Sequence, residues 1–222
     1  MERTIKVTGT GKIAVKPDLT IINLDFSDVL PTYEAALKAS ANDVGVVKDA
    51  LAKAGIDRES LKTTSFNVDA HYESYRDEKG NYKSRFDGYE YHQSLRFKFD
   101  VDNRLLGRVL YQLSTLSINP KFRINYGTKD AEAAKNELLG NAIADAKKKA
   151  EVISRAAGVT LDEIVDINYS WIDVEFSSRP YGVYADEMMM CKCEAPTGAY
   201  DVDIEPEDIE KSDNVTLVFK IK

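Results

Sequence analysis

The stretch 130–158, DAEAAKNELLGNAIADAKKKAEVISRAAG, is the longest uninterrupted helical pattern in the chain. Asp130 is placed to cap the start of this helix and Gly158 to end it. Charged residues occupy the positions that face solvent. The apolar positions recur at spacings of three and four, as the buried face of a helix requires: Leu139, Ile143, Ala146, Ala150, Ile153 and Ala157, with Leu138 and Ala142 widening the stripe. The alanines favour close packing of this helix on a sheet.

The rest of the chain alternates between strand-like and helical patterns. Together they predict an α+β fold with the order ββαββαβαββ, in which helices pack on an antiparallel or mixed sheet. We expect strands at 3–16, 22–26, 66–72, 89–101, 121–126, 165–176 and 215–221, and helices at 32–54, 103–113 and 130–158. The first two strands are expected to form a hairpin, and the polar segment 76–88 to connect the third strand to the fourth.

A β-α-β-β unit can be read twice, over about 20–101 and about 118–221. No Gly/Ser-rich linker separates the two halves, so we expect one domain over 1–222, with two fused subdomains at 1–102 and 103–222. Residues 177–206 show no sustained period and hold three of the six prolines, which predicts a long surface loop.

Charge and hydropathy exclude several classes of partner. A formal net charge of −7 argues against nucleic acid or an anionic membrane as the main partner, because both require a basic face. No apolar run approaches the roughly 20 residues of a membrane-spanning helix. The N-terminal residues lack the apolar segment of a secretory signal, so we expect a cytoplasmic protein, or a periplasmic or extracellular one if a signal peptide has been removed.

The sequence contains none of the catalytic or cofactor-binding motifs with which we compared it. Gly9 and Gly11 lie within a strand pattern and are not followed by a helix, which favours a bulge or the close approach of another element over a phosphate-binding loop. His71 and His92, the two histidines of the chain, fall on successive predicted strands without the spacing of a metal site. We therefore predict no catalytic residue and no cofactor, and interpret the histidines as surface residues.

The Met- and Cys-containing segment 188–193 is the one chemically distinctive cluster. Met189, Cys191 and Cys193 offer soft sulfur ligands for a thiophilic metal, and the Cys-x-Cys pair could be oxidised. A single Cys-x-Cys has no second pair to complete a metal site, however, so an apolar loop tip that packs on a neighbouring surface is the favoured interpretation. We predict no metal site, and keep these three residues as the alternative.

Four segments together resemble one known family by their order and spacing: VTGTG at 7–11 leading to VKPD at 15–18, LKTTSF at 61–66, QSL at 93–95, and 142–158 with the core DAKKKAE at 145–151. They are similar to the SIMPL-domain family of bacterial proteins. This resemblance implies an α+β fold, large ring-like or channel-like homo-oligomers in some members, and an association with the cell envelope or oxidative-stress tolerance. It implies no catalytic residue. The Met/Cys segment is not part of the resembling pattern.

The leading hypothesis is a non-enzymatic interaction or assembly protein that self-associates through exposed sheet edges or the long loop and supports stress tolerance. It predicts a homo-oligomer and leaves any other protein partner unidentified. One alternative is a thiol-based metal or redox sensor that uses Cys191 and Cys193. A second alternative is a small-molecule binding module in a groove between the two β-α-β-β units.

Overall fold

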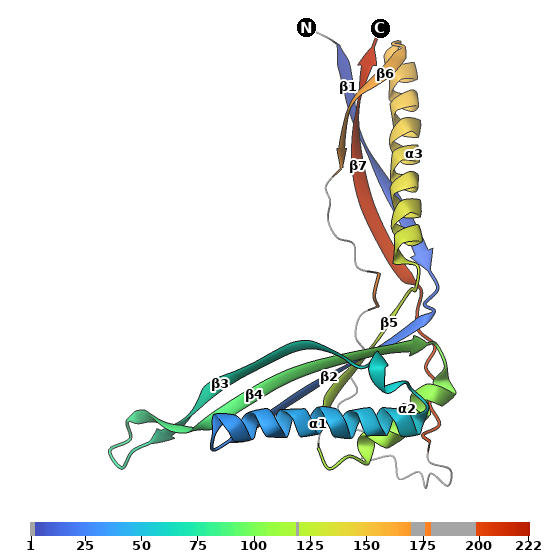
Figure 1. Ribbon diagram of the computed structural model, residues 1–222. Helices are drawn as coiled ribbons and strands as arrows, with labels where there is room; N and C mark the ends of the chain where they lie inside the picture. The colour runs from blue at the N-terminus through green and yellow to red at the C-terminus, as the bar shows by residue number, and fades with distance from the viewer. Residues whose placement is uncertain (1–2, 119, 170–175, 179–198) are drawn as a thin grey trace. The chain divides into compact units, whose positions relative to one another are not determined.

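The computed structural model describes residues 3–118, 120–169, 176–178 and 199–222. Within them the elements follow the predicted order ββαββαβαββ, which confirms the α+β fold class (Figure 1). In chain order they are β1 (Thr4–Val15), β2 (Leu19–Leu30), α1 (Tyr33–Ala54), the short 3-10 helix η1 (Arg58–Ser60), β3 (Lys62–Arg76), β4 (Tyr82–Asp100), α2 (Asn103–Ser114), β5 (Lys121–Gly127), α3 (Ala131–Ala157), β6 (Leu161–Tyr169) and β7 (Ile209–Ile221).

The two long helices begin and end where the sequence predicts. The Asp130 side chain accepts a hydrogen bond from the N–H of Ala133 at 2.8 Å, so it caps the start of α3. Gly158 ends α3 in the left-handed conformation, at φ 68°. Thr32 and Gly55 do the same for α1. These ends depend on local chemistry alone, which is why the sequence is sufficient to place them.

The chain forms two compact units. Unit 1 consists of residues 1–18, 127–178 and 206–222, and unit 2 of residues 19–126 and 179–205. The boundary expected between residues 102 and 103 lies inside unit 2. Each unit has its own apolar core.

Unit 2 is built on a four-stranded sheet with the order β3-β4-β2-β5. Both β2 and β3 run antiparallel to β4. Helix α1 packs on β2 and β4 and against α2. The core between the helices and the sheet contains several side chains that are almost completely buried, among them Ile22, Leu24, Leu51, Leu95 and Phe97.

Unit 1 is built on a three-stranded antiparallel sheet with the order β1-β7-β6. Helix α3 packs on β1 and β7 and hardly contacts β6. The core lies between α3 and the sheet, where small helix residues meet larger strand residues: Val7, Ala142, Ala146, Ala150, Val215, Leu217 and Phe219.

Both units are β-α-β-β units with the same strand order. In unit 2 the first strand, β2, lies beside the third, β4, and the second, β3, lies on the far side of β4. In unit 1 the corresponding strands are β1, β7 and β6. The first strand of unit 1 is therefore separated from α3, β6 and β7 by the whole run from β2 to β5.

This interleaving corrects two predictions. The first strand of the second β-α-β-β unit is β1, not the strand near residue 121, because β5 joins the edge of the sheet in unit 2. The predicted N-terminal hairpin is also wrong, since β1 pairs with β7 and β2 pairs with β4. Alternating side chains identify a strand but carry no information about a partner that is distant in the sequence.

The segment 76–88, predicted as a polar connection, is mostly strand. β3 continues to Arg76 and β4 begins at Tyr82, and the turn between them is closed by Asp77, whose carboxylate accepts from the N–H groups of Lys79 and Asn81. The two strands form a long antiparallel hairpin that extends past the start of α1 (Figure 1). The side chains of its outer part are exposed, and no helix among the described residues packs on them.

The buried stripe of α3 also differs from the prediction. Its most buried residues recur at every fourth position: Ala134, Leu138, Ala142, Ala146, Ala150 and Ser154. Leu139 and Ile143 border this stripe and are partly buried, whereas Ile153 and Ala157 are exposed. A pattern with spacings of three and four fits two neighbouring stripes, and the smaller side chains face the sheet because α3 lies unusually close to β1.

Candidate interaction surfaces

The outer edge of β1 is covered by side chains of α3. Ile221 donates its N–H to the carbonyl of Arg3, so odd-numbered residues of β1 pair with β7, and the main-chain groups of even-numbered residues point away from the sheet. Three side chains of α3 bind these outward groups: Asn141 donates to the Lys12 carbonyl at 3.2 Å, Asp145 accepts from the Thr10 N–H at 2.7 Å, and Lys149 donates to the Thr8 carbonyl at 3.3 Å. We call these three residues the edge ladder.

Charge within the edge ladder strengthens it. The Lys149 ammonium lies 2.7 Å from the Asp145 carboxylate. Its hydrogen bond, together with the one from the Thr10 N–H, lowers the pKa of Asp145 below the ordinary value of 3.8. Asp145 is therefore ionised at neutral pH. An open strand edge invites pairing with another chain, and the edge ladder protects β1 from it along the residues that it reaches.

Two glycines permit this close approach. A Cβ atom at Gly9 would lie 2.1 Å from the Ala142 carbonyl oxygen, and one at Gly11 would lie 2.2 Å from that of Leu138. No side chain fits at either position. β1 pairs with β7 in continuous register, so of the two sequence interpretations, a bulge or the close approach of another element, the second is confirmed.

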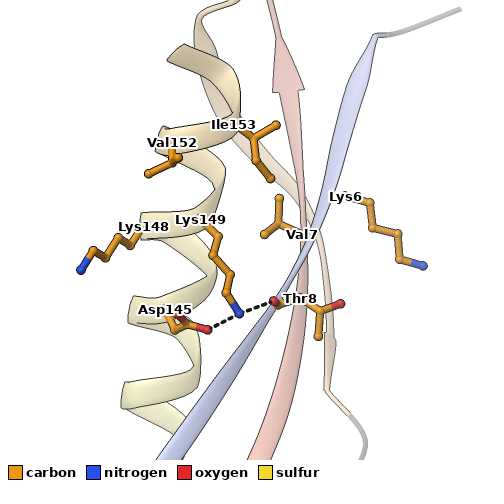
Figure 2. A pocket seen from close by; sticks show the side chains of 8 residues that line it. All are labelled: Lys6, Val7, Thr8, Asp145, Lys148, Lys149, Val152 and Ile153. Atoms are coloured by element: carbon orange, nitrogen blue, oxygen red, sulfur yellow. Dashed lines mark hydrogen bonds and ion pairs between the residues drawn. The ribbon is translucent and has the colours of Figure 1, made fainter. Parts of the chain in front are cut away.

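The edge ladder stops at Thr8, and a hollow of about 500 Å³ follows it, lined by Lys6, Val7, Thr8, Asp145, Lys148, Lys149, Val152 and Ile153. Ile153 is the next residue in the row of Asn141, Asp145 and Lys149, and it is apolar. In the described part of the chain no side chain binds the outward main-chain groups of Lys6. Figure 2 shows Ile153 and Val7 between α3 and β1, and the Lys6 side chain directed away from α3.

The opposite edge of the sheet is β6, which carries exposed apolar side chains and is not covered by any helix or strand of the described residues. Ile164 and Ile167 of β6 lie opposite Phe219 and Leu217 of β7. Their side chains are therefore on the same face of the sheet as α3. They are nevertheless 38% and 57% exposed, because α3 does not extend over β6. Val165, on the same strand, is also exposed, at 44%.

The β3–β4 hairpin of unit 2 exposes a group of aromatic side chains: Phe66, Tyr72, Tyr75, Tyr82 and Phe86, which are 41 to 73% exposed. Edge-to-face contacts connect Tyr72 to Phe86 and Phe86 to Tyr89, with ring centroids 5.8 and 5.4 Å apart. Tyr89 in turn contacts Tyr33 at the start of α1. We call the exposed side chains of Phe66, Tyr72, Tyr75, Tyr82 and Phe86 the aromatic hairpin surface; the strand register places Tyr75 on the opposite face of the hairpin from Tyr72 and Phe86. Each is large enough to contribute strongly to an interface.

The structure brings the two histidines together on a carboxylate that the sequence analysis missed. His71 Nδ1 lies 3.1 Å and His92 Nε2 lies 3.4 Å from the same Glu90 oxygen. The signal in the sequence was that Glu90 and His92 share one face of a strand. All three are partly exposed, as expected for surface residues. Among the described residues, no three His, Cys, Asp or Glu side chains form a group that could hold a metal ion.

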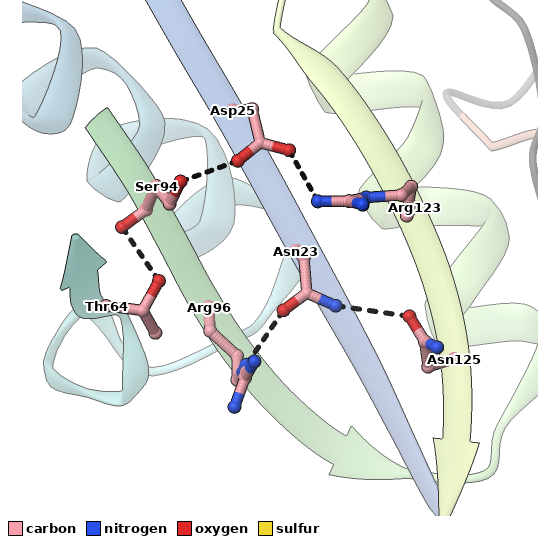
Figure 3. Close-up of polar contacts among 7 residues, drawn as sticks. All are labelled: Asn23, Asp25, Thr64, Ser94, Arg96, Arg123 and Asn125. Atoms are coloured by element: carbon pink, nitrogen blue, oxygen red, sulfur yellow. Dashed lines mark hydrogen bonds and ion pairs between the residues drawn. The ribbon is translucent and has the colours of Figure 1, made fainter. Parts of the chain in front are cut away.

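Other polar groups are paired with one another. On the face of the unit 2 sheet away from α1, Asp25 accepts from Ser94 and Arg123, at 2.6 and 2.9 Å (Figure 3). Asn23 connects Arg96 to Asn125 on the same face (Figure 3). These contacts join the neighbouring strands β4, β2 and β5 through their side chains, which gives them a structural role.

A buried polar pair joins α1 to the sheet. The Tyr91 hydroxyl donates to the Asp43 carboxylate, and nearby Ser40 donates to Gln93 at 3.1 Å. All four residues are buried. Solvent therefore has little access to them, and they serve packing between α1 and β4.

Met189, Cys191 and Cys193, together with most of the predicted loop 177–206, lie outside the described residues. The hypothesis of a thiol-based sensor therefore stays a prediction, as does that of a small-molecule binding module. In the portion that the structure describes, the helices are too short or too polar to cross a membrane.

Comparison with known proteins identifies related chains along almost the whole length. Residues 5–219 match the family model SIMPL, described as a protein of unknown function (DUF541). A 26 kDa periplasmic immunogenic protein of Brucella melitensis biotype 1 is 30% identical over 220 residues, which cover 98% of this chain and 84% of that protein. The protein of the same name from Brucella abortus strain S19 is 29% identical with the same coverage.

Proposed function

The chain belongs to the SIMPL family, and on that premise we propose that it is a non-enzymatic interaction and assembly protein that self-associates through exposed strands and supports stress tolerance. The observation that carries the proposal is the aromatic hairpin surface. Large aromatic side chains at 41 to 73% exposure leave apolar area in water that burial against another chain would stabilise.

The polar clusters of the described residues support a role in interaction over one in turnover. Asp25, Asn23 and Glu90 are each bound to neighbouring side chains, and Tyr91 with Asp43 is buried. An active site generally presents its reactive groups to a substrate in a concave pocket.

The two Brucella relatives are named as periplasmic proteins. By similarity we propose that this chain is also periplasmic. A role in the stress tolerance of the cell envelope would be carried out there. Immunoblotting of periplasmic and cytoplasmic fractions tests the assignment. Recovery of the protein in the cytoplasmic fraction alone would contradict it.

Self-association is tested by light scattering on a sizing column over a range of protein concentrations. We expect the wild-type chain to be a multimer, and the double variant Tyr72→Ser/Phe86→Ser to form a smaller species. Leu37→Ser is the matched control, because Leu37 is an exposed apolar side chain on α1 that lies outside the aromatic hairpin surface. A wild-type protein that stays monomeric at all concentrations overturns the proposal.

A further inference from the structure

The sheet of unit 1 has two edges of opposite character. On β1 the edge ladder binds the outward main chain from Lys12 to Thr8 and leaves that of Lys6 open in the hollow. β6 is hydrogen-bonded to β7 along one of its edges, and no described strand lies beside its other edge. One edge therefore ends in a short gap beneath a helix, and the other is an uncovered strand.

The apolar side chains at the two edges are complementary. Ile153 continues the row of α3 residues that reaches past the edge of β1, and it is 46% exposed. It stands where a further strand beside β1 would pass under α3. Ile164 and Ile167 stand on the α3 face of β6 but beyond the reach of α3 in their own chain. A β6 strand placed beside β1 would bring these isoleucines under Ile153.

The charges are complementary as well. Asp162 and Glu163 of β6 are paired within the chain, with Lys222 and Lys220. Asp166 has no ion pair among the described residues, and neither has Lys6 on β1. Both Lys6 and Asp166 lie across from Val218 in the sheet, so they share the face opposite α3 and lie in the same row.

We propose that β6 of a second copy of this chain docks in the hollow beside Lys6, under Ile153, and extends the sheet of unit 1 through β1. This inference rests on the proposed self-association and names two of the surfaces that carry it. The contact joins two different surfaces, so it is head-to-tail, and successive copies add until the assembly closes on itself or continues as a filament.

The test uses one variant at each edge. Ile153→Glu alters the hollow and leaves β6 intact, while Ile167→Lys alters β6 and leaves the hollow intact. Both side chains are exposed, so we expect both variants to fold, as checked by circular dichroism. Each alone is expected to weaken association by about tenfold or more, measured by sedimentation, whereas Leu37→Lys is expected to behave like the wild type.

Mixing the two variants separates a head-to-tail contact from a symmetric one. The Ile153→Glu chain keeps a working β6 and the Ile167→Lys chain keeps a working hollow, so an equimolar mixture is expected to form pairs with one chain of each kind. Native mass spectrometry distinguishes these pairs by mass. If mixing restores no such pair, β6 binds symmetrically to β6 or the hollow receives a different partner, and the proposal is overturned.

A charge exchange tests the contact without altering an apolar side chain. Lys6→Asp and Asp166→Lys are each expected to weaken association, and the double variant to recover most of it. If the wild type is a multimer that the edge variants leave unchanged, this inference fails while the proposed self-association stands. If the wild type is a monomer, both fail.

Discussion

At the scale of single residues, Gly9 sets the distance between α3 and β1. In Gly9→Ala the new Cβ atom would lie 2.1 Å from the Ala142 carbonyl oxygen, so the helix must move away. We expect the free energy of unfolding to fall by about 3 kcal/mol or more, because overpacking against backbone has no flexible side chain to absorb it. Urea unfolding followed by circular dichroism measures it.

The matched control for Gly9 is Gly140 on α3, which has no atom within 4 Å of its virtual Cβ. Alanine at this helical position is expected to raise stability by about 0.5 to 1 kcal/mol. If Gly9→Ala and Gly140→Ala had similar stabilities, the close packing of α3 on β1 would not exist in solution.

Tyr91 gives a pH dependence with a definite sign. Burial, together with the hydrogen bond to Asp43, raises the pKa of Tyr91 above the ordinary value of 10.0. The folded state therefore holds this proton more tightly than the unfolded state. Its contribution to stability is fully present below pH 10 and is lost as the pH rises above that value.

We expect the free energy of unfolding to decline more steeply above about pH 10 in the wild type than in Tyr91→Phe. At neutral pH the variant is expected to be less stable by about 1 to 3 kcal/mol, because the buried Asp43 carboxylate loses its donor. Urea titrations at a series of alkaline pH values test both statements. Parallel pH profiles for the two proteins would contradict the assigned role of the Tyr91 hydroxyl.

At the scale of elements, the edge ladder makes a prediction about β1. Removal of the carboxylate in Asp145→Ala leaves the outward N–H of Thr10 without its acceptor. We expect the Thr10 amide to exchange with solvent faster, while the amide of Gly9, which points toward β7, keeps its wild-type protection. Hydrogen exchange followed by NMR measures both amides. Equal acceleration at both would mean that the whole strand has loosened.

The elements themselves were largely predictable, because their signals are local. Thr32, Gly55, Asp130 and Gly158 mark helix ends through bonds to residues three or four positions away. Strand pairing was less predictable, since β1 pairs with a strand that ends at residue 221. The exposure of Ile164 and Ile167 on β6 could not be predicted, because alternation indicates which residues share a face and not whether a helix extends over that face.

The sequence predicted that the protein has exposed sheet edges but not where they lie. Exposed sheet edges were expected from the many aromatic and β-branched strand residues, but no pattern indicated which edge was open. The edge ladder had a readable signal, since Asn141, Asp145 and Lys149 recur at every fourth position beside the alanine stripe. Glu90 was missed because its partner His71 reaches it from the neighbouring strand.

At the scale of the whole molecule, each unit has a core of its own. Leu217 in unit 1 and Leu24 in unit 2 are both completely buried, so alanine at either is expected to cost about 2 to 5 kcal/mol. We expect Leu217→Ala to accelerate hydrogen exchange in unit 1 above all, and Leu24→Ala in unit 2. Exchange that rises equally in both units for either variant would show that they unfold as one.

The interleaved order of the strands also has a consequence in time. Thr4 in β1 pairs with Lys220 in β7, so β1 leaves the ribosome well before its partner, which lies more than 200 residues further along the chain. The strands and helices of unit 2 lie between them and can form their sheet earlier, since domains generally fold as they are completed. Until those later segments are synthesised, β1 has neither β7 beside it nor α3 over its glycines, and a factor that shields nascent strands would act there.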